Sequence, residues 1–316
     1  MTKGEIAIRL IEEHPDWSKK KLGEYLHAKH PDLFPSAERA RKVVRVVTGA
    51  AGEESRRKTW RTTDKWRGVP APSKHDYSRV QLPPGKIGLL YDVHIPFYDP
   101  EACEIALTYL ERYKPDTLVL AGDILDCYHV SSFVKDPLER RMSEEIDILR
   151  DFVSMLKRTF KARIIYQLGN HEERWERYIL TQAPAIFGID AFDFENVMDL
   201  DVEIVKNKRI IEAGNLHILH GHEFGRSIFS PVNPARGYFM RAKTSVIGGH
   251  YHQSSEHIER DLSGKIIGAW SVGCLCELTP KYMPINKWSH GFATVDLDSD
   301  GSFEVRNLKI INGKVR

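Results

Sequence analysis

The chain has 316 residues, of which 41% are hydrophobic, and this is enough apolar material for one large domain and a small one. No apolar run approaches the ~20 residues that cross a bilayer, and the N-terminus lacks the apolar region of a signal peptide, so we expect a cytoplasmic protein without a membrane partner. Four irregularly spaced cysteines exclude a disulfide framework and favour reduced thiols.

Charge is spread unevenly along the chain, although the net charge is only +2. Residues 1–80 carry 18 Lys+Arg against 11 Asp+Glu, which gives +7, and the remainder carries 28 against 33, which gives −5. A basic N-terminal part on a mildly acidic body favours a polyanionic partner. A solvated helical face would give the same charge balance.

Apolar periodicity predicts three N-terminal helices at residues 4–14, 19–29 and 36–49, with Ser18 and Ser36 as N-caps. The first helix is expected to bury one face, made by Ile6, Ile8, Leu10 and Ile11. The third is basic, and its candidate nucleic-acid contacts are Arg39, Arg41, Lys42 and Arg45. Residues 1–49 therefore resemble a helix-turn-helix unit that binds DNA. The alternative is a helical cap for protein contact or dimerisation.

Residues 50–84 are predicted to be a linker, because small and charged residues dominate and prolines lie near the end. Cations alternate with indoles inside this segment, as contact with phosphates and stacking on bases require. Arg57 and Trp60 are the candidate contacts. Alternatively, the tryptophans only pin the linker to the main domain.

Strands and helices alternate over residues 85–316, which predicts one α/β domain. Buried strands are expected at 87–91, 117–121 and 164–168, and helices at 100–113 and 137–159. Further strands are expected at 203–205, 209–212, 216–220 and 245–248, with hairpin turns at 261–264 and 298–301. Loop-rich insertions at 128–142 and 223–243 are expected to shape substrate choice.

Five of the expected strands end in the same kind of residue. The ends read Asp92-x-His94, Gly122-Asp123-x-x-Asp126, Gly169-Asn170-His171-Glu172, His220-Gly221-His222 and Gly249-His250-x-His252. Strand ends of one sheet system can meet at one edge, where open α/β sheets place their ligands. Oxygen and imidazole donors without thiolate suit first-row metal ions, and the set is too large for one tetrahedral zinc. A pair of ions that shares one carboxylate would use the whole set.

With these motifs in this order, residues 86–297 resemble the calcineurin-like metallophosphoesterase superfamily. The resemblance implies a four-layer α/β/β/α sandwich, to which the N-terminal helices add a small all-α domain. It implies one metal ion held by Asp92, His94 and His252, a second held by Asn170, His220 and His250, and Asp123 as the bridge between the two. Mn²⁺ is the expected metal, with Fe, Zn²⁺, Ni²⁺ and Mg²⁺ as alternatives.

The resemblance also implies phosphoester hydrolysis by a hydroxide that bridges the two ions. His171 would face the substrate as general acid for the leaving oxygen, oriented by Asp126. Glu172 would support the turn. The candidate substrate-binding residues are Arg174, His129 and His222.

The protein phosphatases of this superfamily carry Gly-Asp-x-x-Asp-Arg-Gly, whereas Asp126 is followed by Cys127-Tyr128, which disfavours a phosphoprotein substrate. The basic N-terminus and linker favour DNA, and the chain then resembles the repair-exonuclease branch. We therefore predict a phosphodiesterase or nuclease that acts on DNA. Two alternatives stay open: a phosphoesterase for a nucleotide or signalling metabolite whose N-terminal helices mediate oligomerisation, and a DNA-binding regulator with a vestigial phosphoesterase fold.

Overall fold

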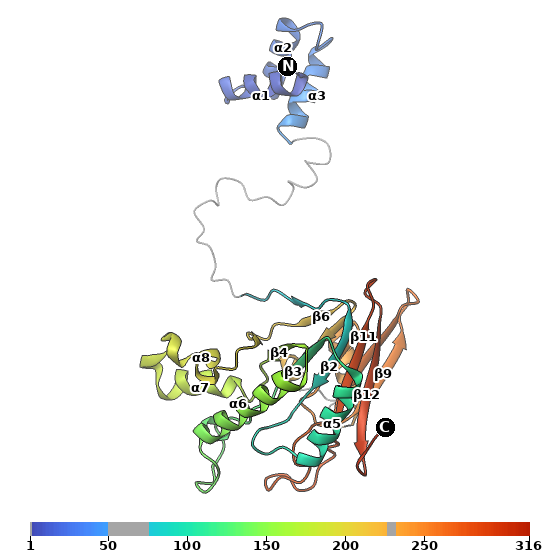
Figure 1. Cartoon of the computed structure of the whole chain (residues 1–316). Helices are drawn as coiled ribbons and strands as arrows, with labels where there is room; N and C mark the ends of the chain where they lie inside the picture. The colour runs from blue at the N-terminus through green and yellow to red at the C-terminus, as the bar shows by residue number, and fades with distance from the viewer. Residues whose placement is uncertain (1, 50–75, 226–231) are drawn as a thin grey trace. The chain divides into compact units, whose positions relative to one another are not determined.

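The computed structural model describes residues 2–49, 76–225 and 232–316. By the distribution of its contacts the chain divides into two compact units, Met1–Lys74 and His75–Arg316. Figure 1 shows helices alone in the first unit and both helices and strands in the second. Within the described residues, no helix combines the length and the apolar composition that crossing a bilayer requires.

The first unit contains α1 (Lys3–Glu13), α2 (Lys19–Lys29) and α3 (Ala37–Val47). Each helix begins after a hydroxyl side chain that accepts a hydrogen bond from the amide three residues on: Thr2 from Glu5, Ser18 from Lys21 and Ser36 from Arg39. Such caps satisfy backbone donors that have no partner inside the helix. The N-caps predicted at Ser18 and Ser36 are confirmed.

These helices enclose one small apolar core, formed by Ala7, Leu10, Leu22, Leu26, Phe34, Ala40 and Val44. The expectation for the first helix was partly wrong, because Ile8 is 46% exposed. Ala7 and Leu10 are three residues apart and share the buried face, whereas Ile8 is turned about 100° from Ala7. The prediction chose Ile8 as a core residue because isoleucine is large and apolar. The smaller Ala7 occupies the core position instead.

A seven-stranded sheet in the second unit has the order β13-β12-β11-β2-β3-β4-β5. Its parallel part consists of β2 (Gly85–Leu90), β3 (Thr117–Ala121), β4 (Arg163–Gln167) and β5 (Glu203–Val205). Its antiparallel part consists of β11 (Gly291–Leu297), β12 (Phe303–Ile311) and β13 (Lys314–Val315). β11 pairs with β2, and the predicted hairpin turn at 298–301 joins β11 to β12.

A six-stranded sheet has the order β1-β6-β7-β8-β10-β9. Its strands are β1 (Val80–Gln81), β6 (Ile211–Ala213), β7 (Leu216–Ile218), β8 (Val246–Gly248), β9 (Ser255–Arg260) and β10 (Ile266–Ser271). β1 falls inside the segment expected to be a linker and pairs in parallel with β6. A strand of two residues is too short to leave a periodic signal in the sequence.

Helices cover the outer faces of the two sheets. α5 (Pro100–Tyr113), α6 (Met142–Thr159) and α8 (Phe194–Met198) pack on the seven-stranded sheet, and α9 (Pro234–Ala242) packs on the six-stranded one. Along β3, Leu118 and Leu120 face the helices while Val119 and Ala121 face the other sheet. The predicted α/β/β/α order of layers is confirmed.

Two insertions differ from the prediction. The helix expected from residue 137 begins at Met142, after a turn in which the Arg141 amide donates to Glu144 Oε2 at 2.8 Å. The segment 223–243, expected to be loop-rich, contains α9 and the end of a 3₁₀ turn, His222–Phe224.

Other short turns are Tyr128–Val130, Pro184–Ile186 and Asp190–Phe192, and α7 (Glu173–Gln182) follows the turn after β4. All four cysteines are buried free thiols.

Candidate metal centre

The five predicted strand ends lie together. Backbone hydrogen bonds join their loops: the His94 amide donates to the Asp123 carbonyl at 2.9 Å, and the Gly249 amide donates to the His220 carbonyl at 2.7 Å. We call the seven predicted metal ligands the polar cluster: Asp92, His94, Asp123, Asn170, His220, His250 and His252. They come from the ends of β2, β3, β4, β7 and β8.

The backbone of the cluster is unusual. Five of its residues have φ between +51° and +68°: Asp92, His94, Asp123, His250 and His252. Side chains other than glycine rarely adopt this left-handed region, and such conformations gather at functional sites because the surrounding structure has to impose them.

Two glycines let the loops close on one another. A Cβ atom at Gly169 would lie 2.2 Å from Asp123 Oδ1, and one at Gly249 would lie 2.3 Å from Asp92 Oδ2. No side chain fits at either place. The glycines that precede Asn170 and His250 in the sequence motifs are therefore required by packing.

One half of the cluster gathers around Asp92. His252 Nε2 lies 3.2 Å from Asp92 Oδ1 and 3.2 Å from His94 Nε2. His94 Nε2 lies 3.8 Å from Asp92 Oδ1. Three donor atoms thus converge at spacings that one cation can span.

The other half gathers around Asp123. Asp123, His220 and His250 each offer a donor atom within 4.8 Å of the others, and Asp123 Oδ2 lies 3.1 Å from His220 Nε2. The same oxygen lies 3.9 Å from His94 Nε2 in the first half. Asp123 therefore reaches both halves.

Several donor atoms of the cluster are buried without a hydrogen-bond partner. They are Asp92 Oδ1, Asn170 Oδ1 and His220 Nε2, the last despite its closeness to Asp123. Buried polar atoms are rarely left unsatisfied in folded proteins. Buried oxygen and imidazole donors without a partner fit divalent metal ions.

Charges within the cluster oppose the effect of burial. Burial would raise the pKa values of Asp92 and Asp123, but neighbouring histidines hold both well below their usual range. Burial would lower the pKa of His220 and His252, but Asp123 and Asp92 raise them to about 10 and about 9. Burial, followed by the positive charge of His220, lowers the pKa of His250 to about 3.

We predict from these pKa values that metal binding releases protons. His220 and His252 are protonated at neutral pH in the metal-free protein, and each must lose a proton before its nitrogen can bind a cation. Affinity for Mn²⁺ should therefore rise from about pH 6 to about pH 9. Calorimetry in two buffers of different ionisation enthalpy should show release of about two or more protons.

The control for this experiment is His257→Gln, which removes a histidine outside the cluster that pairs with Glu259. It should release as many protons as the unaltered chain. Binding heats that do not depend on the buffer would contradict the prediction.

Asp126 lies between two histidine rings. His94 Nδ1 donates to its Oδ1 at 2.9 Å, and His171 Nδ1 lies 2.9 Å from the same oxygen while donating to the Asp126 carbonyl at 3.0 Å. His171 Nε2 is 3.7 Å from Asp123 Oδ2. The expected pairing of Asp126 with His171 is present, and the contact with His94 is an addition to it.

Arg174 contacts His171 directly. Its Nη2 lies 2.8 Å from His171 Nε2, and its Nη1 donates to the Asp126 carbonyl at 2.9 Å. Because a guanidinium has only donors, His171 Nε2 accepts this bond and the ring carries its proton on Nδ1. Arg174, the predicted phosphate contact, is therefore at the cluster, with its side chain only 13% exposed.

Glu172 supports the turn, as expected. Its carboxylate accepts hydrogen bonds from the amides of Asp123, Ile124, Leu125 and Gly169 and from the Tyr166 hydroxyl, at 2.8–3.0 Å. It thereby fixes the β3 and β4 ends together. Glu223 does the same for the β7 end, since it accepts from the amides of His220 and Gly221 at 3.1 and 2.6 Å.

His222 and His129, the two histidines proposed for substrate binding, lie in different places. The His222 ring lies 5.3 Å from that of His220 and 6.3 Å from that of His250, and its Nε2 pairs with Glu173 at 3.2 Å. His222 is therefore beside the cluster. His129 instead donates to the Arg140 carbonyl, and no contact of the described residues joins it to the cluster.

Sequence reasoning missed the neighbours of His252. Cys276 Sγ lies 3.7 Å from His252 Nδ1, and the Trp288 ring lies 4.2 Å from the His252 ring. The Cys274-x-Cys276 pattern was a signal, but on its own it points to no particular chemistry.

On α3, Arg39, Lys42 and Arg45 are exposed, whereas Arg41 is half-buried and pairs with Glu38 at 3.4 Å. The remaining candidate nucleic-acid contacts, Arg57 and Trp60, lie outside the described residues.

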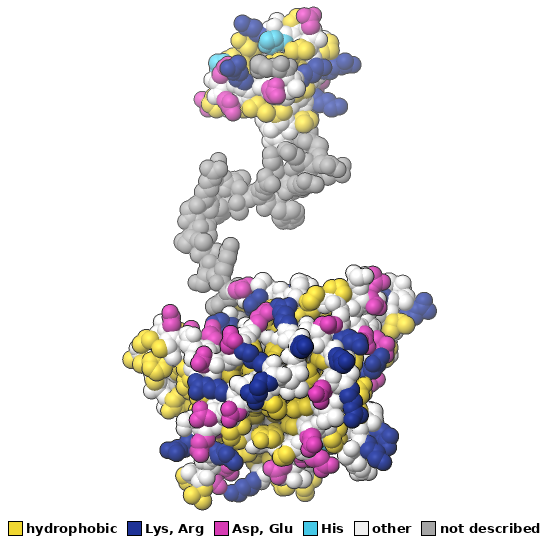
Figure 2. Space-filling model, viewed as in Figure 1, with side chains coloured by type: hydrophobic (Ala, Val, Ile, Leu, Met, Phe, Trp, Pro, Cys, Tyr) yellow, Lys and Arg dark blue, Asp and Glu magenta, His cyan; other side chains and the backbone are white. Residues whose placement is uncertain are grey.

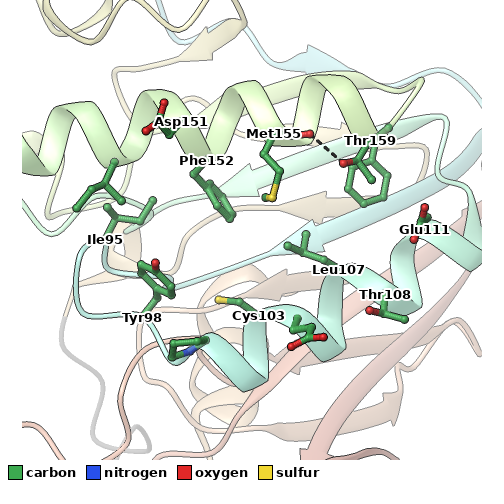
Figure 3. A pocket seen from close by; sticks show the side chains of 14 residues that line it. Ile95, Tyr98, Cys103, Leu107, Thr108, Glu111, Asp151, Phe152, Met155 and Thr159 are labelled. Atoms are coloured by element: carbon green, nitrogen blue, oxygen red, sulfur yellow. Dashed lines mark hydrogen bonds between the residues drawn. The ribbon is translucent and has the colours of Figure 1, made fainter.

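A cavity of about 570 Å³ lies between α5 and α6, and Ile95, the residue after His94, is part of its lining. Phe152 and Met155 point from α6 toward Leu107 of α5, as Figure 3 shows. In Figure 2 hydrophobic side chains gather over these two helices, with acidic ones at their margin. None of the residues that line the cavity belongs to the polar cluster. This cavity is lined mainly by apolar side chains, while the polar cluster lies at the strand ends.

Comparisons with known proteins give a family and several relatives. The family model for calcineurin-like phosphoesterases matches residues 86–254. The chain is 27% identical over 230 residues to the Gene 54 protein of Mycobacterium phage L5, across 67% of this chain and 89% of that protein. It is 26% identical over 232 residues to the Gene 54 protein of Mycobacterium phage D29, across 68% and 90%.

Among solved structures, a dimetal phosphatase from Danio rerio aligns with a TM-score of 0.37 and 14% identity, across 69% of this chain and 94% of that one. The family match covers more than half of the chain and contains all seven residues of the polar cluster. The chain belongs to the calcineurin-like phosphoesterase family and is a metal-dependent phosphoric ester hydrolase.

Proposed function

We propose that the chain is a two-metal phosphodiesterase or nuclease that cleaves DNA. Asp92, His94 and His252 hold one ion, Asn170, His220 and His250 hold the other, and Asp123 is shared. The distances from Asp123 Oδ2 to His220 Nε2 and His94 Nε2, 3.1 and 3.9 Å, support the sharing.

Bound divalent ions supply a water of lowered pKa and positive charge for the phosphoryl oxygens. We propose Mn²⁺, because the donors are oxygen and imidazole. Cys276 Sγ lies 3.7 Å from His252 Nδ1, and donor atoms of Cys276, His94 and His252 lie within 4.8 Å of one another, so a thiol borders this half of the cluster.

His171 is the proposed general acid for the leaving oxygen. Asp126 fixes the ring through Nδ1, so that Nε2 is the nitrogen nearest to Asp123. Arg174 now donates to that nitrogen, and a ring in this state has no proton on Nε2 to give. We propose that Arg174 moves to a phosphoryl oxygen when substrate binds. His171 Nε2 then takes up a proton from water while Nδ1 keeps its own, and Nε2 gives this proton to the leaving oxygen.

The observation that carries the DNA assignment is the exposed basic face of α3. Arg39, Lys42 and Arg45 recur at intervals of three residues, so they lie along one side of the helix. Such a row can neutralise neighbouring phosphates of one DNA strand. Residues 2–49 would then hold the substrate that the second unit cleaves.

We predict that replacing all three residues with Gln weakens DNA binding by the full-length chain. The slope of log K against log[salt] should become less steep by about 2–3, because up to three counterions are no longer released. Fluorescence anisotropy over a salt series measures this slope.

The matched control replaces Lys3, Lys19 and Lys20 with Gln, which removes the same charge from exposed positions of α1 and α2. This control variant should show the same slope of log K against log[salt] as the unaltered chain. Equal slopes in both variants would show that α3 is no DNA-binding helix.

A Mn²⁺-dependent hydrolysis panel tests the function itself. It contains bis(4-nitrophenyl) phosphate, 4-nitrophenyl phosphate, cyclic nucleotides, and single- and double-stranded DNA. The proposal expects turnover of the diester and of DNA. Hydrolysis of nucleotides without DNA cleavage would instead support the metabolite phosphoesterase, and DNA binding without any hydrolysis would support the regulator.

A further inference from the structure

The segment after β10 brings aromatic side chains to the edge of the polar cluster. Trp288 packs edge-on against His252, with ring centroids 4.2 Å apart and planes at 61°, and Tyr282 packs against Trp288 at 6.3 Å. Neither ring has a part in holding the ions.

The segment is fixed by its own hydrogen bonds. Asn286 donates to the Leu278 carbonyl at 2.6 Å and accepts from the Trp288 amide at 2.8 Å. The Ser289 amide donates to the His252 carbonyl at 2.8 Å, which ties the segment to a loop of the cluster. The aromatic pair is therefore in place before a substrate binds, and little ordering is needed on binding.

The ring of Tyr282 is left to solvent, since this residue is 74% exposed. Its neighbour Lys281 pairs with Asp136 at 3.1 Å, so the segment meets the insertion before α6, where Phe133 and Val134 are exposed as well. The exposed ring nearest to the cluster is that of Tyr282, through its contact with Trp288. Exposed apolar surface beside a polar site marks the place where an apolar or aromatic part of a ligand is bound.

We propose that Tyr282 stacks on a nucleobase next to the scissile phosphate, supported from behind by Trp288. This inference rests on the DNA function proposed above, and it narrows the substrate to a strand that is unpaired at this point. One sugar separates a base from its phosphate, so a ring beside the cluster meets the adjacent base. In a duplex the faces of that base are covered by its neighbours, and only an unstacked base can reach the tyrosine.

The test compares two single-stranded oligonucleotides of equal length, one with bases and one in which abasic sites replace them. The unaltered Mn²⁺-loaded chain should prefer the first by about 5- to 100-fold in kcat/KM, the range expected for one stacked base. Tyr282→Ala should bring this ratio close to 1, and Tyr282→Phe should restore it. Ile285→Ala, which removes an exposed apolar side chain of the same segment, should leave it unchanged.

Outcomes against the inference are distinct from failure of the proposed function. If DNA is cleaved but Tyr282→Ala keeps the full preference, stacking is refuted while the nuclease stands. If Tyr282→Ala loses its Mn²⁺, the residue is structural and the inference is wrong. If only double-stranded DNA is cleaved, the inference is wrong while the nuclease stands. If neither form of DNA is cleaved while methyl 4-nitrophenyl phosphate is hydrolysed, the DNA function fails, and the inference with it.

Discussion

Replacing Asp123 with Asn should reduce hydrolysis of every phosphoester to the background of the assay. Asp123 Oδ2 is the oxygen that lies near both His220 and His94, and its Oδ1 accepts the His171 amide at 2.9 Å. An amide has no negative charge to share between two cations, so at least one ion should be lost. Metal analysis of the purified variant, beside its initial rates, measures both effects.

Asp261→Asn is the matched control, because Asp261 caps an exposed hairpin turn by accepting the Lys265 amide. It should keep full metal content and rate. Metal-stimulated hydrolysis that survives in Asp123→Asn would show that another residue holds the two ions together.

Replacing His171 with Gln should lower turnover of DNA by ~10²–10⁴-fold while both ions remain bound. Glutamine can donate a hydrogen bond but cannot transfer a proton to the leaving oxygen. The size of the loss should therefore depend on the leaving group. A 4-nitrophenolate leaves without protonation, so hydrolysis of bis(4-nitrophenyl) phosphate should fall much less than that of DNA.

Equal losses on both substrates would contradict the role of general acid and leave His171 as a positioning residue. Loss of metal from the variant would mean that His171 belongs with the ligands, which its 3.7 Å separation from Asp123 would then explain.

Much of the fold followed from local patterns. The strands at 117–121 and 203–205 have the predicted bounds, because short buried runs are flanked by turn residues. α9 was missed because Gly225, Pro231 and Gly237 gave its segment the composition of a loop. Its signal was Asn233-Pro234: Asn233 caps the helix by accepting the Arg236 amide at 3.0 Å, and Pro234 takes the first helical position.

The convergence of the polar cluster could be predicted because each member follows a strand, and the carboxyl ends of neighbouring strands meet. The side chains that contact the histidines of this site could not be predicted. Cys276 and Trp288 reach His252 from a segment without a motif, and the bond from Arg174 to His171 depends on the first turn of α7. Contacts of this kind are set by loop paths that no periodicity encodes.

The most direct test of the account is an anomalous difference map from crystals of the full chain grown with Mn²⁺. Two peaks ~3.5–4 Å apart should appear in the polar cluster, with Asp123 touching both. A single peak, or manganese bound away from Asp92, Asn170 and His220, would contradict the two-metal site on which the proposed chemistry depends.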